Sequence, residues 1–101
     1  MDLREKLEAD IMETNWTPLA EHFAKGAVYL LDKDLDMVEV GESMASDNIS
    51  TVKEWLDNGL MYPPTPEEAL KFSETDEVLF NMLIIVLHDS IRVFTHFKTF
   101  V

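Results

Sequence analysis

The chain has 101 residues, of which 47% are apolar, 20 are acidic, 8 are basic and none is cysteine. This size and composition predict a single α+β domain spanning residues 1–101 with its own core, and they argue against a disordered chain. The lack of cysteine excludes disulfides and thiolate metal sites, and the net charge of −12 should repel phosphate backbones and anionic lipids.

The negative charge is confined to the first three-quarters of the chain. Residues 77–101 hold two acids and two bases, so residues 1–76 carry the full net charge of −12. The opening Met1–Lys6 segment is charged and no apolar run follows it, which predicts no secretory signal. The longest apolar run, Met82–Leu87, is far shorter than the ~20 residues that span a bilayer. We therefore expect a cytoplasmic protein that does not contact membranes.

Two amphipathic helices are predicted at the N-terminus. The first has apolar residues at every fourth position and one more beside the last of them: Leu3, Leu7, Ile11 and Met12. The second begins at Thr17-Pro18, an N-cap followed by proline at the first helical position, and ends at Gly26. Its Leu19 and Phe23 should face the core, and Trp16 should pack at the joint between the two helices.

A short buried strand and two further helices are predicted in the middle of the chain. The strand is the apolar run Ala27–Leu31. The apolar spacing predicts a helix over residues 36–46, although Val38 and Val40 also permit a short strand there. The next helix begins at Asp47 or Asn48 and ends at Asn58-Gly59. Its predicted inner stripe consists of Ile49, Val52, Trp55 and Leu56.

The C-terminal part is predicted to be a short helix and a β-hairpin. Thr65-Pro66-Glu67-Glu68 is a capping box that opens a helix to about Phe72. Leu79–Leu87 is almost wholly apolar, which is typical of a strand covered on both faces. His88-Asp89-Ser90 is a plausible turn, and the alternation in Ile91–Lys98 predicts a half-exposed strand.

This order of elements resembles a winged-helix domain with extra helices. N-terminal helices are followed by one short central strand, a helix-turn-helix-like pair over Val38–Leu60, and a C-terminal hairpin. A recognition helix over Asp47–Asn58 would nevertheless present only one basic side chain to DNA, that of Lys53, together with two acidic ones. Since DNA binding requires Lys and Arg to neutralise phosphates, we do not expect nucleic acid as a partner.

No residue pattern predicts a catalytic, metal or cofactor site. Asp32–Asp36 has the alternating acids of a calcium loop, but Met37 and Ser43 stand where such a loop needs glycine and glutamate, so we expect a helix-capping turn. No two of the three histidines have a metal-ligand spacing; His88 could pair with Asp89 at a turn. The three glycines form no phosphate-binding loop, and no cofactor is expected.

Two groups of aromatic and apolar residues are candidates for a partner interface. Trp55, Met61 and Tyr62 lie near Pro63-Pro64 and could form an exposed patch, although Trp55 could equally be a core residue beside a surface turn. The near-neutral C-terminal strands could form a dimer interface or pair at a sheet edge through their aromatic residues. These are Phe94, Phe97 and Phe100.

An ordered set of segments resembles a known family. They are Leu3–Leu7, Glu13–Trp16, Gly26–Leu30, Leu35–Val40 and Val52–Leu60. Together they resemble the small bacterial proteins of domain-of-unknown-function family 2288, over residues 2 to about 86. The resemblance implies a bacterial cytoplasmic setting and supplies no activity, cofactor or catalytic residue. Beyond Val86, family members continue with a Gln-Pro-aromatic element, whereas this chain has Leu87-His88-Asp89-Ser90.

Three functions follow from these features. The first hypothesis is a non-catalytic protein-binding or accessory domain that self-associates through its C-terminal strands. The second is a winged-helix-like transcriptional regulator. The third is an enzyme, which would need a cleft lined by several acids together with His22 or His88.

Overall fold

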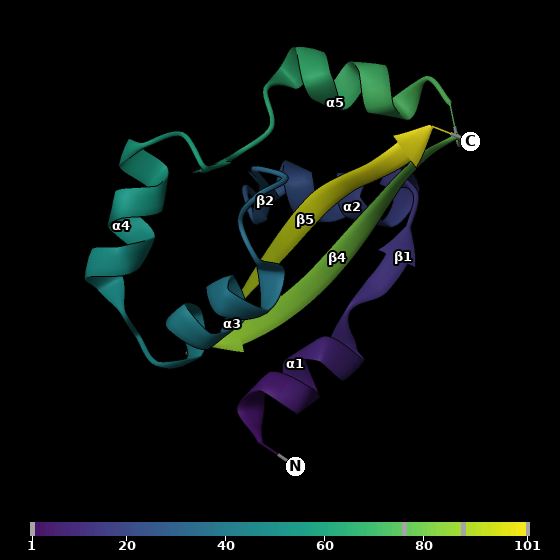
Figure 1. Ribbon diagram of the computed structural model, residues 1–101. Coiled ribbons are helices and arrows are strands. Elements are labelled where there is room, and N and C mark those ends of the chain that lie inside the picture. Colours follow the sequence, from purple (N-terminus) through teal and green to yellow (C-terminus); the bar gives the residue numbers. More distant parts are fainter. Residues whose placement is uncertain (1, 76, 88, 101) are drawn as a thin grey trace.

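The chain folds into a mixed five-stranded sheet with helices on both faces (Figure 1). The computed structural model describes residues 2–75, 77–87 and 89–100, without the side chains of residues 87 and 98–100. In chain order the elements are α1 (Leu3–Asp10), β1 (Met12–Thr14), α2 (Trp16–Ala24), β2 (Val28–Leu31), α3 (Met37–Ala45), α4 (Ile49–Asp57), β3 (Met61–Tyr62), α5 (Pro66–Ser73), β4 (Val78–Leu87) and β5 (Ser90–Phe100). The fold is therefore α+β, as the sequence predicts.

The C-terminal hairpin lies inside the sheet. The strand order is β1-β4-β5-β2-β3, and β5 runs parallel to β2 while the other neighbours are antiparallel. A winged-helix domain carries its hairpin as a peripheral wing, and the structure does not show that arrangement. The reason is that β1 and β2 each pair with one strand of the hairpin and enclose it on both sides.

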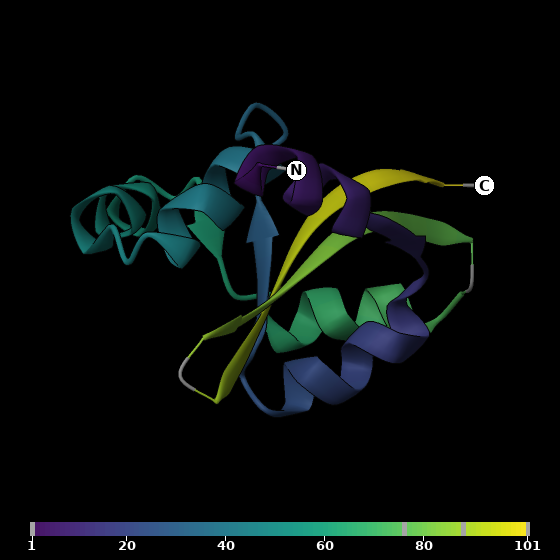
Figure 2. The same cartoon turned by 90° about the horizontal axis from the view of Figure 1, so that it is seen from below.

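Two apolar cores pack against the two faces of the sheet, and Figure 2 shows helices on both sides of it. One core joins α1, α3 and α4 to one face; its buried members include Leu7, Val40, Trp55, Leu83 and Phe94. The other core joins α2 and α5 to the opposite face; its buried members include Trp16, Leu19, Ala69, Phe80 and Val93. The two faces of the sheet are thus covered by different helices.

The ends of the helices follow local capping chemistry. α2 begins two residues earlier than the sequence predicts, because the N-cap is Asn15 and not Thr17; the side chain of Asn15 accepts a hydrogen bond from the backbone N–H of Thr17. It ends at Ala24, and Gly26, just beyond the C-cap Lys25, has a positive φ of 72° and provides the stop that the sequence predicts. α5 carries the predicted capping box, in which the side chains of Thr65 and Glu68 each accept from the other residue's backbone N–H.

The ambiguous segment after the acidic turn is helical. Asp36 is the N-cap of α3 and accepts from the N–H of Val38 at 2.9 Å, so the prediction of a helix-capping turn at Asp32–Asp36 is confirmed. The strand alternative is wrong, because a helix buries Val38 and Val40 together with Met37 against the sheet.

The structure differs from the sequence-based expectations at three strands. Met12 belongs to β1 and not to the first helix, because it pairs with Met82 of β4. β3 was not predicted; it pairs with β2 through Met61. β5 is not half-exposed along its length, because neighbours on opposite faces, Val93 and Phe94, are both buried. In each case a pairing between segments far apart in the chain overrides the local pattern.

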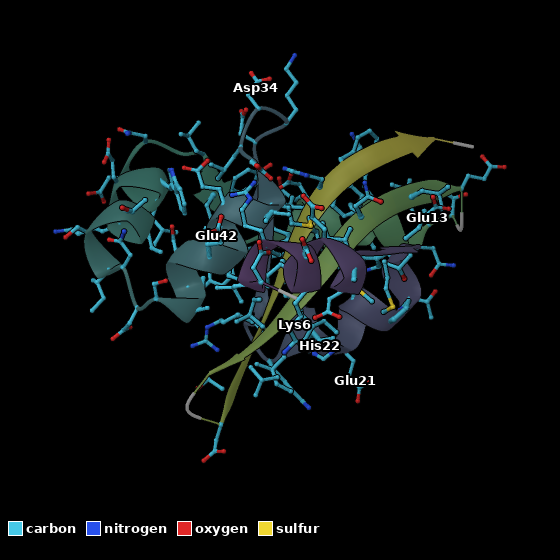
Figure 3. The ribbon with its side chains drawn as sticks, turned by 60° about the horizontal axis from the view of Figure 1, so that its bottom comes forward. Lys6, Glu13, Glu21, His22, Asp34 and Glu42 are labelled. Atoms are coloured by element: carbon cyan, nitrogen blue, oxygen red, sulfur yellow. The ribbon has the colours of Figure 1, made fainter. Side chains whose placement is uncertain are left out.

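Acidic side chains come from many elements, including those of Glu13, Glu21, Asp34 and Glu42 (Figure 3). Arg4 of α1 forms an ion pair with Glu42 of α3 and lies 3.4 Å from Asp36, so it ties α1 to α3. Among the described residues, no helix has the length and apolar character needed to cross a membrane.

Candidate protein-binding groove

A sharp connection sets α4 beside α3. The N–H groups of Asp47 and Asn48 bond back to the carbonyls of Met44 and Ser43, which closes α3 with the pattern that glycine usually makes. Here the left-handed position is taken by Asp47, with a φ of 56°. Asn48 then caps α4 by accepting from the N–H of Thr51. Only three residues separate the two helices, so their side chains meet at the joint.

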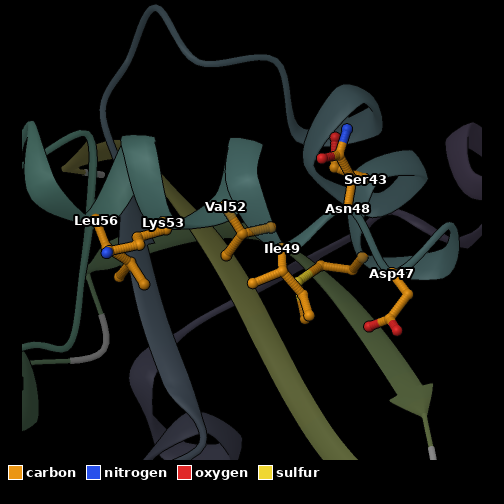
Figure 4. A pocket seen from close by; sticks show the side chains of 8 residues that line it. Ser43, Asp47, Asn48, Ile49, Val52, Lys53 and Leu56 are labelled. Atoms are coloured by element: carbon orange, nitrogen blue, oxygen red, sulfur yellow. The ribbon is translucent and has the colours of Figure 1, made fainter.

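A hollow of about 290 Å³ opens at this joint (Figure 4). Its lining consists of Ser43, Met44, Asp47, Asn48, Ile49, Val52, Lys53 and Leu56, and we call it the α3–α4 groove. Ile49, Val52 and Leu56 project from one side of α4, because residues three and four apart lie on the same face of a helix. The floor of the groove is therefore apolar, and its polar groups lie at one end and along the rim.

The apolar residues of α4 are more exposed than the sequence predicts. Ile49 is 70% exposed and Leu56 is 42% exposed, so the predicted inner stripe is wrong at these two positions. Trp55 is buried in the core as expected, and Val52 is half-buried. A helix of this length can turn only part of its apolar surface to the sheet, and the rest faces the groove.

The lining of the groove carries one charge of each sign, and the negative excess lies on other exposed residues of α4. Asp47 and Lys53 belong to the lining, and Glu54 and Asp57 are exposed elsewhere on α4. The eight lining residues include no histidine and no arrangement of a nucleophile with a base. The groove thus offers mainly apolar surface to a ligand.

The six residues proposed from sequence as a partner interface lie in different environments. Trp55, Met61 and Phe94 are buried and contribute to the core beneath α3 and α4. Tyr62 and Phe97 are exposed, on β3 and β5. The side chain of Phe100 lies outside the described part of the structure. The use of these residues by a partner stays a prediction, and sequence reasoning missed that Ile49 and Leu56 are exposed.

The exposed Tyr62 has a specific polar partner. Its hydroxyl lies 3.3 Å from the carboxylate of Glu68 in α5. Burial of the phenol, followed by the negative charge of Glu68, raises the pKa of Tyr62 above its ordinary value of 10.0. The contact joins β3 to α5 at the edge of the sheet.

The two described histidines, His22 and His96, lie in separate hollows. His96 lies in a second hollow of about 280 Å³, where its Nε2 is 3.1 Å from the carbonyl oxygen of Asp32. His22 lies beside Asp89 and Arg92 in another hollow. His88 is outside the described residues, so its predicted pairing with Asp89 stays a prediction. Among the described residues, no group of three His, Cys, Asp or Glu is placed to hold a metal ion.

Comparison with known proteins establishes the family. A family model described as "Protein of unknown function (DUF2288)" matches residues 2–87. The chain belongs to the DUF2288 family. A solution structure of PA1075 from Pseudomonas aeruginosa is similar, with a TM-score of 0.71 and 29% sequence identity over 96% of this chain and 85% of that one. The comparison with curated proteins gives no match.

The family match and the structural match differ in how much of the chain they cover. The DUF2288 match ends at Leu87, the last residue of β4, which agrees with the resemblance seen in the sequence. The α3–α4 groove lies wholly within the matched residues. The similarity to PA1075 extends over 96% of the chain and so reaches into β5. The structural similarity to PA1075 therefore continues beyond the residues that the family model matches.

Proposed function

We propose that this DUF2288 protein is a non-catalytic, cytoplasmic protein-binding domain whose α3–α4 groove takes an amphipathic helix with basic residues on its polar side. The observation that carries the proposal is the 70% exposure of Ile49 over an apolar hollow. An isolated exposed apolar residue needs no explanation, but a group of them around a cavity is typical of a binding site.

The geometry of the groove favours a helical ligand. Ile49, Val52 and Leu56 recur at the spacing of one helix face and form a ridge along α4 (Figure 4). Met44 of α3 belongs to the same lining. Ridges of this kind accept the side chains of a second helix between them, and peptide-binding grooves commonly use anchors spaced three and four residues apart.

The charge of the protein favours a basic ligand. The net charge is −12, and α4 itself carries Glu54 and Asp57 against Lys53. A positively charged partner would be attracted on approach, whereas an acidic partner would be repelled. The ligand that fits both the apolar surface of the groove and the negative electrostatic potential around it is therefore a basic amphipathic helix.

A synthetic helical peptide of leucine and lysine tests the proposal by fluorescence anisotropy. The wild-type protein should bind it, and Ile49→Ser should weaken binding by about tenfold or more because a central anchor contact is lost. Leu70→Ser is the matched control, since Leu70 is 64% exposed on α5 and away from the groove. Equal binding by wild type and Ile49→Ser, or an equal loss in Leu70→Ser, would show that the groove is not the site.

Separate assays test the two alternative functions. A winged-helix-like regulator should shift duplex DNA at low salt, where phosphate contacts are strongest. An enzyme should show turnover that depends on His22 or His96, the two described histidines that line hollows. We expect neither. Lys53 is the one basic residue of α4, which is too little positive charge to hold DNA. Asp34 and Asp36 line the same hollow as His96, but among the described residues they form no group of three with it that could hold a metal ion.

A further inference from the structure

One side of β4 lacks a strand partner along its second half. On this side β1 pairs with Phe80–Met82, and the chain before Met12 turns away into α1. Within the described residues, no strand continues the pairing along Leu83–Leu87. We call Leu83–Leu87, on the side away from β5, the open edge of β4.

The backbone groups of this edge point outward. The N–H of Val93 in β5 donates to the carbonyl of Ala27 at 2.8 Å, next to β2, so it faces away from β4. Val93 is the partner of Ile84, and opposite residues in an antiparallel pair alternate between bonded and non-bonded pairs. The N–H and C=O of Ile84, and those of Val86 two residues on, therefore face the open edge.

Apolar side chains accompany these backbone groups. Val86 is 63% exposed and Ile84 is 38% exposed, and both lie on the face of the sheet that α2 and α5 cover elsewhere. Met12 and Ile91, the exposed residues at the adjoining strand positions, extend the same surface. Two hollows of about 280 and 290 Å³ border the edge, between α1 and Ile84–Val86.

The sequence of this edge contains none of the residues that usually prevent pairing with another strand, and hollows separate it from α1. Proteins usually protect edge strands with charged residues, proline or bulges, whereas the open edge reads Leu-Ile-Ile-Val-Leu. The single irregularity of the β4–β5 ladder lies between Leu79 and Phe80, away from this segment. An exposed apolar edge of this composition promotes aggregation unless a regular partner covers it.

The charge distribution identifies that partner as a second copy of this chain. The excess negative charge lies in residues 1–76, while residues 77–101 are neutral. The hairpins of two copies can therefore approach each other without net charge repulsion. Lys6 and Asp10 of α1 flank the edge and carry opposite charges. A two-fold axis through Ile85 would place Ile84 opposite Val86 of the partner subunit. The N–H and the C=O of Ile84 would then both form hydrogen bonds with the backbone of that residue.

We propose that two copies of this chain associate by antiparallel pairing of their β4 open edges, which joins the two five-stranded sheets into one. The pairing satisfies the backbone groups of Ile84 and Val86 and removes their side chains from water. It is independent of the α3–α4 groove, which lies on other elements.

Size-exclusion chromatography with light scattering tests the pairing on the full chain. The wild type should have twice the mass of one chain, and Val86→Lys and Val86→Pro should each return it to one chain mass. Proline is informative because it removes the outward N–H without removing a bond to β5. Val86→Thr, Leu70→Lys and Ile49→Lys are controls and should remain dimeric; circular dichroism checks that each variant is folded.

Hydrogen exchange of the dimer separates edge pairing from other contacts. The amides of Ile84 and Val86 should be protected in the dimer and should lose that protection on dilution to monomer. A monomeric wild type, a dimer unaffected by both Val86→Lys and Val86→Pro, or a dimer in which these two amides exchange freely would each overturn the proposal. A dimer broken by Ile49→Lys alone would instead place the contact at the α3–α4 groove.

Discussion

Gly41 lies where α3 approaches both α1 and β4. A Cβ added there would come within 3.0 Å of a terminal carbon of Leu7 and of one of Leu83, and both leucines are buried. The glycine destabilises the helical state of α3 by about 1 kcal/mol relative to alanine. Its missing side chain lets the helix pack closely against α1 and β4.

Gly41→Val should therefore destabilise the protein by about 1–3 kcal/mol through overpacking. Urea denaturation followed by circular dichroism measures the change. The double variant Gly41→Val with Leu7→Ala removes the obstructing methyl groups, so it should be less destabilised than the sum of its two single variants. Strict additivity would mean that Leu7 is not the obstacle.

Asp47 occupies a backbone position that favours glycine. Its φ of 56° lies in the left-handed region, which costs a residue with a Cβ about 1 kcal/mol. Asp47→Gly should raise the free energy of unfolding by about 0.5–1 kcal/mol, since the added freedom of the unfolded chain offsets part of the gain. Asp47→Asn controls for removal of the charge at the C-terminus of α3. If Asp47→Asn raises the free energy of unfolding as much as Asp47→Gly does, the effect comes from the charge and not from the backbone conformation.

Tyr62 links stability to pH at the alkaline end. Burial and the Glu68 carboxylate raise the folded-state pKa of the phenol, so the contribution of Tyr62 to stability is full below its unfolded pKa of 10.0 and is lost as the pH rises through the folded pKa. Glu68→Gln removes the negative charge but can still accept the bond from the N–H of Thr65. In a Tyr29→Phe background, the absorbance titration of Tyr62 should move to lower pH in Glu68→Gln; an unchanged midpoint would exclude the contribution of Glu68.

The helix α5 depends on its capping box. The side chain of Thr65 accepts from the N–H of Glu68 at 3.1 Å, and Glu68 returns the bond to the N–H of Thr65 at 3.0 Å. Thr65→Ala should cost about 1 kcal/mol, whereas Thr65→Ser keeps the acceptor and should cost much less. Thermal denaturation measures both; similar losses in the two variants would show that the hydroxyl is not what stabilises α5.

The accuracy of prediction at the scale of elements follows the range of the interactions. All five helices were predicted from sequence because caps and apolar spacing are local signals, as at Asn48, Gly59 and Thr65. β1 and β3, with three and two residues, owe their strand conformation to pairing with distant segments. No local pattern marks so short a strand.

The candidate site was less predictable for the same reason. The sequence shows that Ile49 and Leu56 belong to the apolar face of a helix, but not how much of that face the sheet can cover. The Schellman-type turn at Asp47 sets the angle between α3 and α4, and aspartate does not signal such a turn as glycine does. Exposure at the α3–α4 groove could be found only from the structure.

At the scale of the whole molecule, charge opposes folding. The net charge of −12 comes from 20 acids and 8 bases, and its acidic side chains extend from many elements. The two ion pairs of Arg4 provide limited relief, because they are exposed and pairs of that kind contribute little. Repulsion among the acids therefore outweighs attraction, and screening should stabilise the folded state.

We expect the melting temperature to rise when salt is added from low ionic strength to about 0.15 M, where the Debye length falls to about 8 Å. Two neutralising variants on adjacent residues of α4 provide matched controls at a fixed protein concentration. Glu54→Gln removes one negative charge and should reduce the salt dependence, whereas Lys53→Gln removes a positive charge and should increase it. A melting temperature that falls with salt in the wild type would mean that specific ion pairs, and not overall repulsion, dominate the electrostatics of the fold.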